Sequence, residues 1–232
     1  MTELNGKSIL VIGASGAFGN EFCKQLTALG AQLIGTASSA ESSSRLPANL
    51  AQRLLLDLGN RDSIKVLTQY LLESETQIDG IVLAAGLVAF GPTHETPHEV
   101  TARLMQVNAL GQVETVNQLL PKLKASAEQN RSPFVVSISG VISEAPMPGL
   151  AAYSASKTAL LGYAKAAAKE FKKFGVRWLD ARPGHTQSGL ADRAIFGTAP
   201  NFGAGAEVSF VVSRIVQGIT NDEADLSSES FK

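Results

Sequence analysis

Short apolar runs alternate with longer helical stretches along almost the whole chain, and this alternation constrains the fold more than any other feature. Residues 9–12 (Ile-Leu-Val-Ile) and 81–83 (Ile-Val-Leu) are uninterrupted apolar runs, as expected for strands buried on both faces. Strand–helix alternation repeated this often predicts an α/β fold. We expect a single doubly wound parallel sheet of the Rossmann type, with six to seven strands and helices on both faces.

The pattern predicts six strands and six helices. Strands are expected over residues 8–13, 32–37, 53–58, 80–85, 134–139 and 176–181, and helices over 19–29, 62–73, 100–107, 111–126, 151–174 and 207–218. The serine-rich segment 38–44 is too short for a disordered linker and is interpreted as a strand–helix connection. Residues 226–231 are expected to add a last strand or to fray. Without a repeat or a linker, residues 1–232 are expected to form one domain.

Composition and charge exclude several classes of protein. The net charge of −1 provides no electrostatic footprint for nucleic acid or an anionic membrane. Cys23 is the only cysteine, which excludes an internal disulfide and a multi-thiolate zinc site. The first residues lack the pattern of a signal peptide, and lysines interrupt the alanine-rich stretch that could otherwise cross a bilayer. We expect a soluble, cytoplasmic protein with no nucleic-acid or membrane partner.

A glycine-rich turn joins the first strand to the first helix. Gly13 can form the tight turn, Gly16 lets backbone N–H groups approach a pyrophosphate, and Gly19 permits close helix–sheet packing. The helix N-terminus that follows offers unpaired N–H donors and a favourable dipole. Ser15 and Phe18 belong to the same turn. A purely structural turn is the alternative, but the strand–turn–helix setting predicts a cradle for dinucleotide phosphates.

The end of the second strand indicates which dinucleotide is bound. A carboxylate here would bind the ribose 2′-hydroxyl and favour NAD. Ala37 and Ser38 stand there instead, so nothing repels a 2′-phosphate, which Ser38, Ser39 and Arg45 could bind. The sequence therefore predicts NADP, with NAD less favoured.

The third and fourth strands end in two further candidate sites. Asp57, followed by Leu58, lies where a carboxylate could accept a hydrogen bond from the adenine amino group. Capping of the next helix is an equal alternative for Asp57. Ala85 and Gly86 end the fourth strand, where the backbone either passes close to the adenosine ribose or simply turns.

Tyr153 and Lys157 are four residues apart, which places a phenol and an ammonium on one helical face. A tyrosine with its ordinary pKa near 10 is a poor acid–base group at neutral pH. A neighbouring lysine and an oxidised nicotinamide ring both favour the phenolate and would lower that pKa. The pair alone is a weak signal, because such spacing also arises by chance.

These features occur together in an order typical of one family. The glycine turn, Asp57, residues 84–86, residues 107–109, Tyr153 with Lys157, and residues 182–184 resemble the short-chain dehydrogenase/reductase family, in particular the single-domain type that includes 3-oxoacyl carrier-protein reductases. The resemblance runs from about residue 7 to about residue 188. It implies an NADP(H)-dependent oxidoreductase that reduces a ketone or aldehyde or oxidises a secondary alcohol, assembled as a homodimer or homotetramer.

The resemblance also implies roles for individual residues. Tyr153 would be the general acid in carbonyl reduction and the general base in alcohol oxidation. Lys157 would tune Tyr153 and bind the nicotinamide ribose. Asn108 would interrupt its helix and hold a water in a proton relay through Lys157. Three further positions match residues beside the nicotinamide: Pro183, Gly184 and Ser188.

The sequence departs from the family's pattern at the expected catalytic serine. That position is Gly140, and Ser139 precedes it. We expect a bulge or a longer loop to bring Ser139 to the substrate carbonyl; otherwise Tyr153 acts alone, and the reaction slows by about 10²–10³. The alternatives are a non-catalytic dinucleotide-binding redox sensor or scaffold, and an isomerase or dehydratase without net hydride transfer.

The histidines and loop aromatics complete the candidates. His94 and His98 flank Pro97 without a metal-binding motif, so we expect solvated loop residues and no metal site. His185 either faces the substrate or lies exposed on its loop. Four residues are candidates for an apolar substrate pocket: Phe90, Met147, Phe196 and Phe202.

Overall fold

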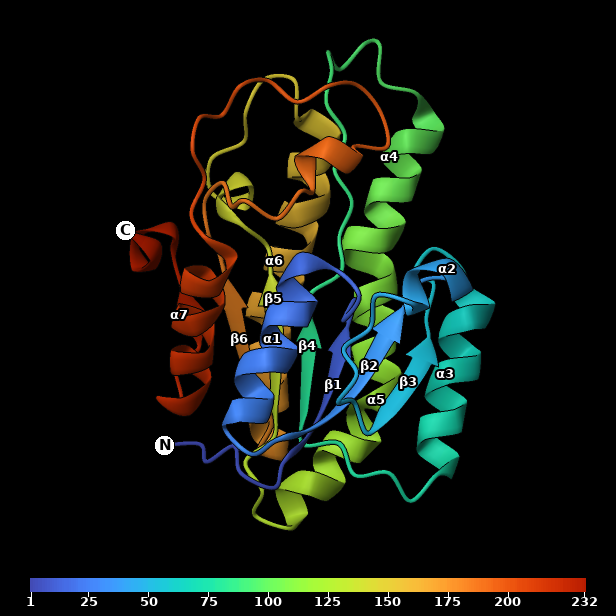
Figure 1. Cartoon of the computed structure of the whole chain (residues 1–232), viewed down its shortest axis with the longest axis vertical. Coiled ribbons are helices and arrows are strands. Elements are labelled where there is room, and N and C mark those ends of the chain that lie inside the picture. The colour runs from blue at the N-terminus through green and yellow to red at the C-terminus, as the bar shows by residue number, and fades with distance from the viewer.

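Seven strands pair in parallel in the order β3-β2-β1-β4-β5-β6-β7 in a computed structural model that describes all 232 residues. Helices cover both faces of this sheet (Figure 1). The predicted doubly wound α/β sheet is therefore confirmed. The strands are β1 (Ser8–Ile12), β2 (Gln32–Ala37), β3 (Gln52–Leu55), β4 (Gly80–Leu83), β5 (Phe134–Ile138), β6 (Arg177–Ala181) and β7 (Asp225–Leu226).

The uninterrupted apolar strands are explained by two hydrophobic cores, one on each face. Successive side chains of a strand point to opposite faces, so Ile9 and Val11 enter one core while Leu10 and Ile12 enter the other. Helices α1 (Ala17–Ala28) and α7 (Val208–Thr220) cover the first face. The second face packs against α3 (Arg61–Glu73), α5 (Gly111–Glu128) and α6 (Ala151–Phe171).

The strand order reverses at β1, which pairs with β2 on one side and with β4 on the other. In such a sheet the crevice for a ligand opens beyond the carboxyl ends of the strands at this switch point. The turn after β1, the end of β2 and the segment after β4 therefore meet at one edge. In Figure 1 this is the upper edge, beneath the loops that follow β5 and β6.

Two strands end at least two residues earlier than predicted, and both differences concern the site. The third strand ends at Leu55, not at residue 58, so Asp57 and Leu58 lie in the loop that follows. The fourth strand ends at Leu83, not at residue 85. Ala85 and Gly86 therefore also lie beyond the sheet, where irregular backbone can approach a ligand.

The helix predicted over residues 100–107 begins two residues earlier and is joined to the next one. Helix α4 (His98–Met105) continues through a π-helical turn, Gln106–Leu110, directly into α5. The residue after this turn, Gly111, has to be a glycine, because a Cβ there would lie 2.3 Å from the carbonyl oxygen of Leu58. Single π-helical turns inside helices are frequent at functional sites.

The serine-rich connection and the C-terminal tail also form local structure. Residues 38–44 contain a one-turn helix, α2 (Ala40–Ser43), whose N-cap is Ser39. The last strand expected near residues 226–231 is present but shorter, because β7 covers only Asp225–Leu226 and a 3₁₀ turn, Ser228–Phe231, follows it. No helix in the structure combines the length and the apolar character needed to span a membrane.

Candidate active site

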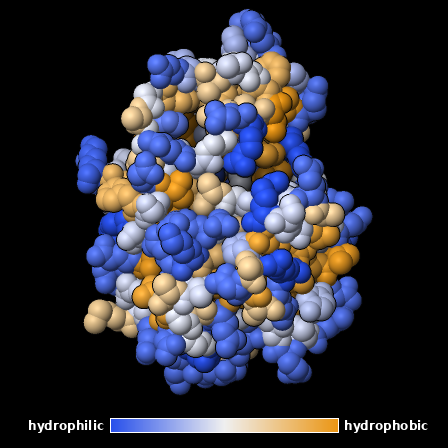
Figure 2. Space-filling model, in the orientation of Figure 1, coloured by the Kyte–Doolittle hydropathy of each residue, from blue (hydrophilic) through white to orange (hydrophobic).

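A cavity of about 620 Å³ opens at the switch point and collects most of the predicted site residues. It runs beneath the loops at the upper edge of the sheet, where the surface is hollowed and apolar residues lie among hydrophilic ones (Figure 2). The predicted residues that line it are Gly13, Ser15, Gly16, Phe18, Ser38, Asp57, Leu58, Ala85, Gly86, Tyr153, Lys157, Pro183, Gly184 and Ser188. Gly19, Asn108 and Ser139 do not line it.

The glycine turn leaves the start of α1 open toward this cavity. Gly13 has a φ of +83°, and a Cβ there would lie 2.8 Å from the backbone nitrogen of Ala85. A Cβ at Gly19 would lie 2.2 Å from the carbonyl oxygen of Gly13. Gly16 caps α1 without a side chain, and no acidic residue stands in the first turn. The backbone N–H groups and the dipole of α1 thus remain available to an anion.

The end of β2 forms one end of the cavity, and its chemistry suits a phosphate. Ser38, Ser42 and Arg45 line the cavity here, and β2 brings no carboxylate to this end. The Arg45 side chain is exposed and makes no hydrogen bond or ion pair within the protein. Ser39 does not reach the cavity, because its hydroxyl caps α2 and accepts a hydrogen bond from the Ser42 N–H at 3.2 Å.

Asp57 faces the cavity but does not cap the helix after it. Asn60 is the cap of α3, and its Oδ1 accepts from the Asp62 N–H at 2.9 Å. The Oδ1 of Asp57 instead accepts from the Gly59 N–H at 2.8 Å and lies 3.2 Å from Nη2 of Arg103. The capping alternative for Asp57 is therefore wrong, and a role toward a ligand stays a prediction.

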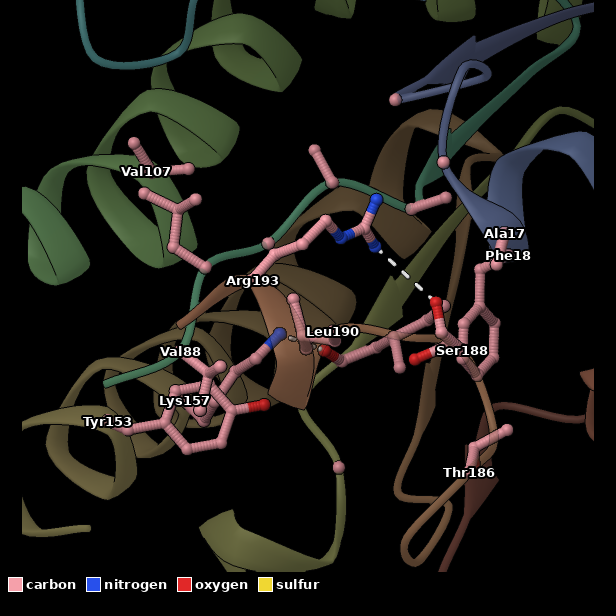
Figure 3. Close-up of a pocket in the computed structure, with 18 of the residues that line it drawn as sticks. Ala17, Phe18, Val88, Val107, Tyr153, Lys157, Thr186, Ser188, Leu190 and Arg193 are labelled. Carbon is pink, nitrogen blue, oxygen red and sulfur yellow. Dashed lines mark hydrogen bonds between the residues drawn. The ribbon is translucent and has the colours of Figure 1, made fainter. Parts of the chain in front are cut away.

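Helix α6 brings Tyr153 and Lys157 to the cavity one turn apart, and Figure 3 shows both side chains there. Lys157 Nζ donates a hydrogen bond to the carbonyl oxygen of Ile138 at 2.8 Å. The Tyr153 hydroxyl points into the cavity in Figure 3 and has no hydrogen-bond partner in the protein. It is thus free to bond a ligand.

Burial controls the protonation of both groups. It raises the pKa of Tyr153 to about 12. Burial also lowers the pKa of Lys157 to about 8, a change that the nearby Asp180 carboxylate partly opposes. The expected lowering of the Tyr153 pKa by Lys157 is not seen in the structure, because desolvation dominates and the ammonium donates to Ile138 instead. Tyr153 is therefore a protonated phenol at neutral pH.

Asn108 lies inside the π-helical turn, fully buried beside the cavity. Its Oδ1 accepts from the Leu87 N–H at 2.8 Å, and its Nδ2 donates to the Leu87 carbonyl at 2.9 Å and to Ser156 Oγ at 2.9 Å. The side chain thus fixes the segment after β4 to α6. The water-holding role that the resemblance implies for Asn108 remains a prediction.

Ser139 does not reach the cavity, so the contact with the substrate carbonyl that was expected of it is wrong. Its side chain is fully buried, and its Oγ donates to Oδ1 of Asp180 at 2.5 Å. Ser137 donates to the other carboxylate oxygen of Asp180, also at 2.5 Å, and Ser143 donates to the Gly140 carbonyl at 2.7 Å. No serine hydroxyl of this segment is left to take the place of a serine at Gly140.

Gly140 itself has a backbone that favours glycine. Its φ of 72° and ψ of 161° fall in a region that residues with a Cβ rarely adopt. Space does not exclude a side chain, because a Cβ would meet only the Pro183 carbonyl oxygen at 3.7 Å. Glycine is favoured at this position by the backbone conformation and not by a lack of space for a side chain.

Sequence reasoning missed a charged network beneath the site. Asp180 and Arg182 are buried, and Nη1 of Arg182 lies 3.1 Å from Oδ1 of Asp180. Arg182 also pairs with Glu144 and, at 2.6 Å, with Asp225. Burial raises the pKa of Asp180, although the serine and arginine donors oppose that shift. The sequence signal was available: Asp180 interrupts the apolar end of a strand otherwise buried on both faces.

The other end of the cavity is apolar. Val88, Phe90, Ile142 and Leu150 form a small core with which Tyr153 and Phe202 pack. Among the predicted pocket aromatics and methionine, Phe90, Met147 and Phe202 line the cavity, whereas Phe196 does not.

The three histidines have different surroundings. His185 lines the cavity and stacks on Phe202, with ring centroids 5.1 Å apart. His94 is exposed, and its Nε2 lies 3.4 Å from Oε1 of Glu95. His98 begins α4 and is not a loop residue as expected. No three His, Cys, Asp or Glu side chains come together to hold a metal ion.

Comparison with known proteins agrees with this geometry. A sequence model described as short chain dehydrogenase matches residues 7–195. A dehydrogenase/reductase SDR family protein 7-like of Anopheles gambiae is 29% identical over 242 residues, covering 97% of this chain and 75% of that protein. A 3-ketoacyl-(acyl-carrier-protein) reductase from Brucella melitensis, solved with NADH, superposes with a TM-score of 0.86 at 17% identity, over 99% of this chain and 100% of that one.

A second solved structure has the same fold. It is a short-chain dehydrogenase from Sphingobium yanoikuyae in complex with NADPH, with a TM-score of 0.85 and 21% identity over 95% of this chain and 87% of that chain. At such identity these structures establish the fold alone. The family match covers most of the sequence and includes the glycine turn, Tyr153 and Lys157. This chain belongs to the short-chain dehydrogenase family.

Proposed function

We propose that this NAD(P)-dependent oxidoreductase uses NADP(H) to reduce a ketone or aldehyde, or to oxidise a secondary alcohol, with Tyr153 as the acid–base group. One observation carries the proposal. The unpartnered hydroxyl of Tyr153 and the open N-terminus of α1 face one continuous cavity. That arrangement provides a proton donor and a phosphate cradle in the same space.

The residues present fit a dinucleotide along this cavity. A Cβ at Gly13 would strike the backbone of Ala85 and one at Gly19 the carbonyl oxygen of Gly13, so glycine is what lets this turn leave the start of α1 open. At one end, Ser38 and Arg45 suit a 2′-phosphate, because Arg45 is an unpaired guanidinium and β2 brings no carboxylate to this end. This end therefore supports NADP over NAD.

A bound nicotinamide would supply or accept the hydride, and the side chains would donate or accept the proton. In carbonyl reduction, Tyr153 Oη donates its proton to the oxygen that gains negative charge; in alcohol oxidation it accepts that proton. Lys157 stays charged below its pKa of about 8. Its ammonium, one turn from Tyr153, would bind ribose hydroxyls and favour the phenolate once the proton has left.

The glycine at position 140 limits this chemistry. With Ser139 turned toward Asp180, Tyr153 is the hydroxyl that remains for the substrate oxygen. A missing second donor would slow the reaction by about 10²–10³. This same feature favours the alternative function, a dinucleotide-binding redox sensor or scaffold without turnover.

The apolar end of the cavity supports a small substrate with an apolar body. Phe90, Met147, Leu150 and Phe202 line the space beside Tyr153 and offer little to a charged group. The carbonyl would lie at the Tyr153 hydroxyl, with the apolar part directed toward these side chains.

The test is NADPH oxidation, followed by its absorbance, with a panel of apolar ketones and aldehydes. Turnover that Tyr153→Phe abolishes would support the proposal. Tyr163→Phe is the matched control, because Tyr163 lies on the same helix but bonds Asn117 at the surface. Cofactor binding without turnover on any compound would favour the sensor, and equal activity in Tyr153→Phe would refute the assigned role.

A further inference from the structure

Arg193 enters the cavity from the loop that follows β6, and no expected function accounts for it. It ends a short 3₁₀ turn, Ala191–Arg193, and its side chain lines the cavity. Its Nε donates to the Gly189 carbonyl at 3.1 Å and its Nη2 to the Ser188 carbonyl at 3.4 Å. No carboxylate lies within ion-pair distance of the guanidinium.

The loop that carries Arg193 is attached to the opposite wall of the cavity. The Ile195 N–H donates to the Val88 carbonyl, and the Phe90 N–H donates to the Phe196 carbonyl, each at 2.9 Å. Gly197 has a φ of +69°, and a Cβ there would lie 1.9 Å from the Phe90 carbonyl oxygen. The loop therefore lies closed over the cavity, with the backbone near Arg193 held in place.

The other cations of the cavity already have a partner or lie at its ends. Arg103 pairs with Asp57, Arg45 stands beside Ser38, and Lys157 lies one turn from Tyr153. Arg193 is the cation between these ends. In Figure 3 its guanidinium extends across the cavity toward Ser188, with Ala17 and Phe18 of α1 beyond it.

We propose that Arg193 is a cofactor-binding residue that holds the pyrophosphate of the dinucleotide from the side opposite the N-terminus of α1. This inference rests on the proposed function. A pyrophosphate carries two negative charges, and the glycine turn meets them with backbone N–H groups alone. A guanidinium offers a planar fork of donors that fits phosphate oxygens.

The contacts that Arg193 makes in the structure are ones that a phosphate could replace. The two hydrogen bonds of Arg193 go to main-chain carbonyls, and the one to Ser188 is long. Charge-assisted bonds to phosphate are stronger than bonds to neutral carbonyls. A dinucleotide therefore gives the guanidinium a better partner, and its binding tightens the contact between the loop and α1.

The test compares the Kd of two ligands in the wild type, Arg193→Ala and a control variant by isothermal titration calorimetry. NADPH contains the pyrophosphate, whereas adenosine 2′-monophosphate contains only the end that Ser38 and Arg45 would bind. Arg193→Ala should raise the Kd of NADPH about tenfold and leave the Kd of adenosine 2′-monophosphate unchanged. Arg53→Ala is the control for net charge, because Arg53 is exposed outside the cavity and bonds only the Pro47 carbonyl; it should bind both ligands as the wild type does.

Arg193→Lys adds a second readout, since it keeps the charge but loses the fork; its Kd for NADPH should fall between those of the wild type and Arg193→Ala. An NADPH Kd within twofold of the wild-type value in Arg193→Ala would overturn the inference. The inference would also be overturned if Arg193→Ala raised the Kd of both ligands equally. It would fail too if that variant kept the NADPH Kd and raised the KM for an anionic substrate. Failure of the wild type to bind NADPH would overturn the proposed function itself, a result distinct from these three.

Discussion

Replacing Lys157 with methionine should stabilise the ligand-free protein while it abolishes turnover. Lys157 is 6% exposed, and its ammonium has one main-chain hydrogen bond, to Ile138. Burial lowers its pKa from the usual 10.5 to about 8. The folded state therefore holds the charged form less well than the unfolded chain does, which costs about 3 kcal/mol of stability at neutral pH. Methionine has similar length and no charge.

The net gain is smaller because the Ile138 carbonyl loses its donor. That loss costs about 1 kcal/mol, so Lys157→Met should raise the free energy of unfolding by about 2 kcal/mol at pH 7. For a chain of this size the melting temperature would rise by roughly 4–8 °C. Lys165→Met is the matched control, because Lys165 is exposed on the same helix; it should change stability by less than about 0.5 kcal/mol.

The pH dependence of the stability difference between the wild type and Lys157→Met tests this explanation more directly. Below pH 8 the lysine is charged in both states, and the full cost of burial is present. As pH rises from about 8 to 10.5, the folded state releases its proton first, so wild-type stability increases relative to the variant. Urea unfolding of both proteins at pH 7 and pH 10 measures this difference. A variant less stable than the wild type at pH 7, or a gain that persists unchanged at pH 10, would refute the reasoning.

Three further substitutions test the site. Gly140→Ser should lower stability by about 1–3 kcal/mol through backbone strain, whereas Gly162→Ala, in open space on α6, should gain up to about 1 kcal/mol; a Gly140→Ser variant as stable as the wild type would contradict the account. Arg45→Ala should raise the Kd of NADPH about tenfold with the Kd of NADH unchanged, and an equal loss for both would disprove the 2′-phosphate role. Asp180→Ala should cost about 3–5 kcal/mol in urea unfolding because it leaves buried donors unpaired; a loss under about 1 kcal/mol would show that the network is dispensable.

The sheet and the glycine turn were predictable because their physical causes are local. A strand buried on both faces must be apolar at every position, which residues 9–12 show without any knowledge of the fold. The turn needs glycine where a Cβ would strike the backbone, as at Gly13 and Gly19. Both constraints appear in the sequence at the positions where they act.

The orientation of Ser139 was not predictable in the same way. Side chains alternate along a strand, so Ser137 and Ser139 share one face. Which neighbour they meet depends on the pairing of β5 with β6, where Ser137 lies opposite Asp180. Register between strands distant in sequence is set by the whole sheet, and only the structure shows that a buried carboxylate accepts both hydroxyls.

Arg193 was missed for a related reason. It lies in an irregular loop, where no periodicity indicates the direction of a side chain. Its place in the cavity depends on the contacts of Ile195 with Val88 and of Phe196 with Phe90. Such contacts join segments roughly 100 residues apart, and propensity or spacing does not indicate them.

Direct titration of the purified protein with NADPH and NADH tests whether this cavity binds NADP(H). The fluorescence of each nucleotide reports binding without any knowledge of the substrate. The arrangement of Arg45, Ser38 and the open α1 terminus predicts saturable binding of both, with NADPH at least about tenfold tighter. Binding of neither nucleotide would contradict the account.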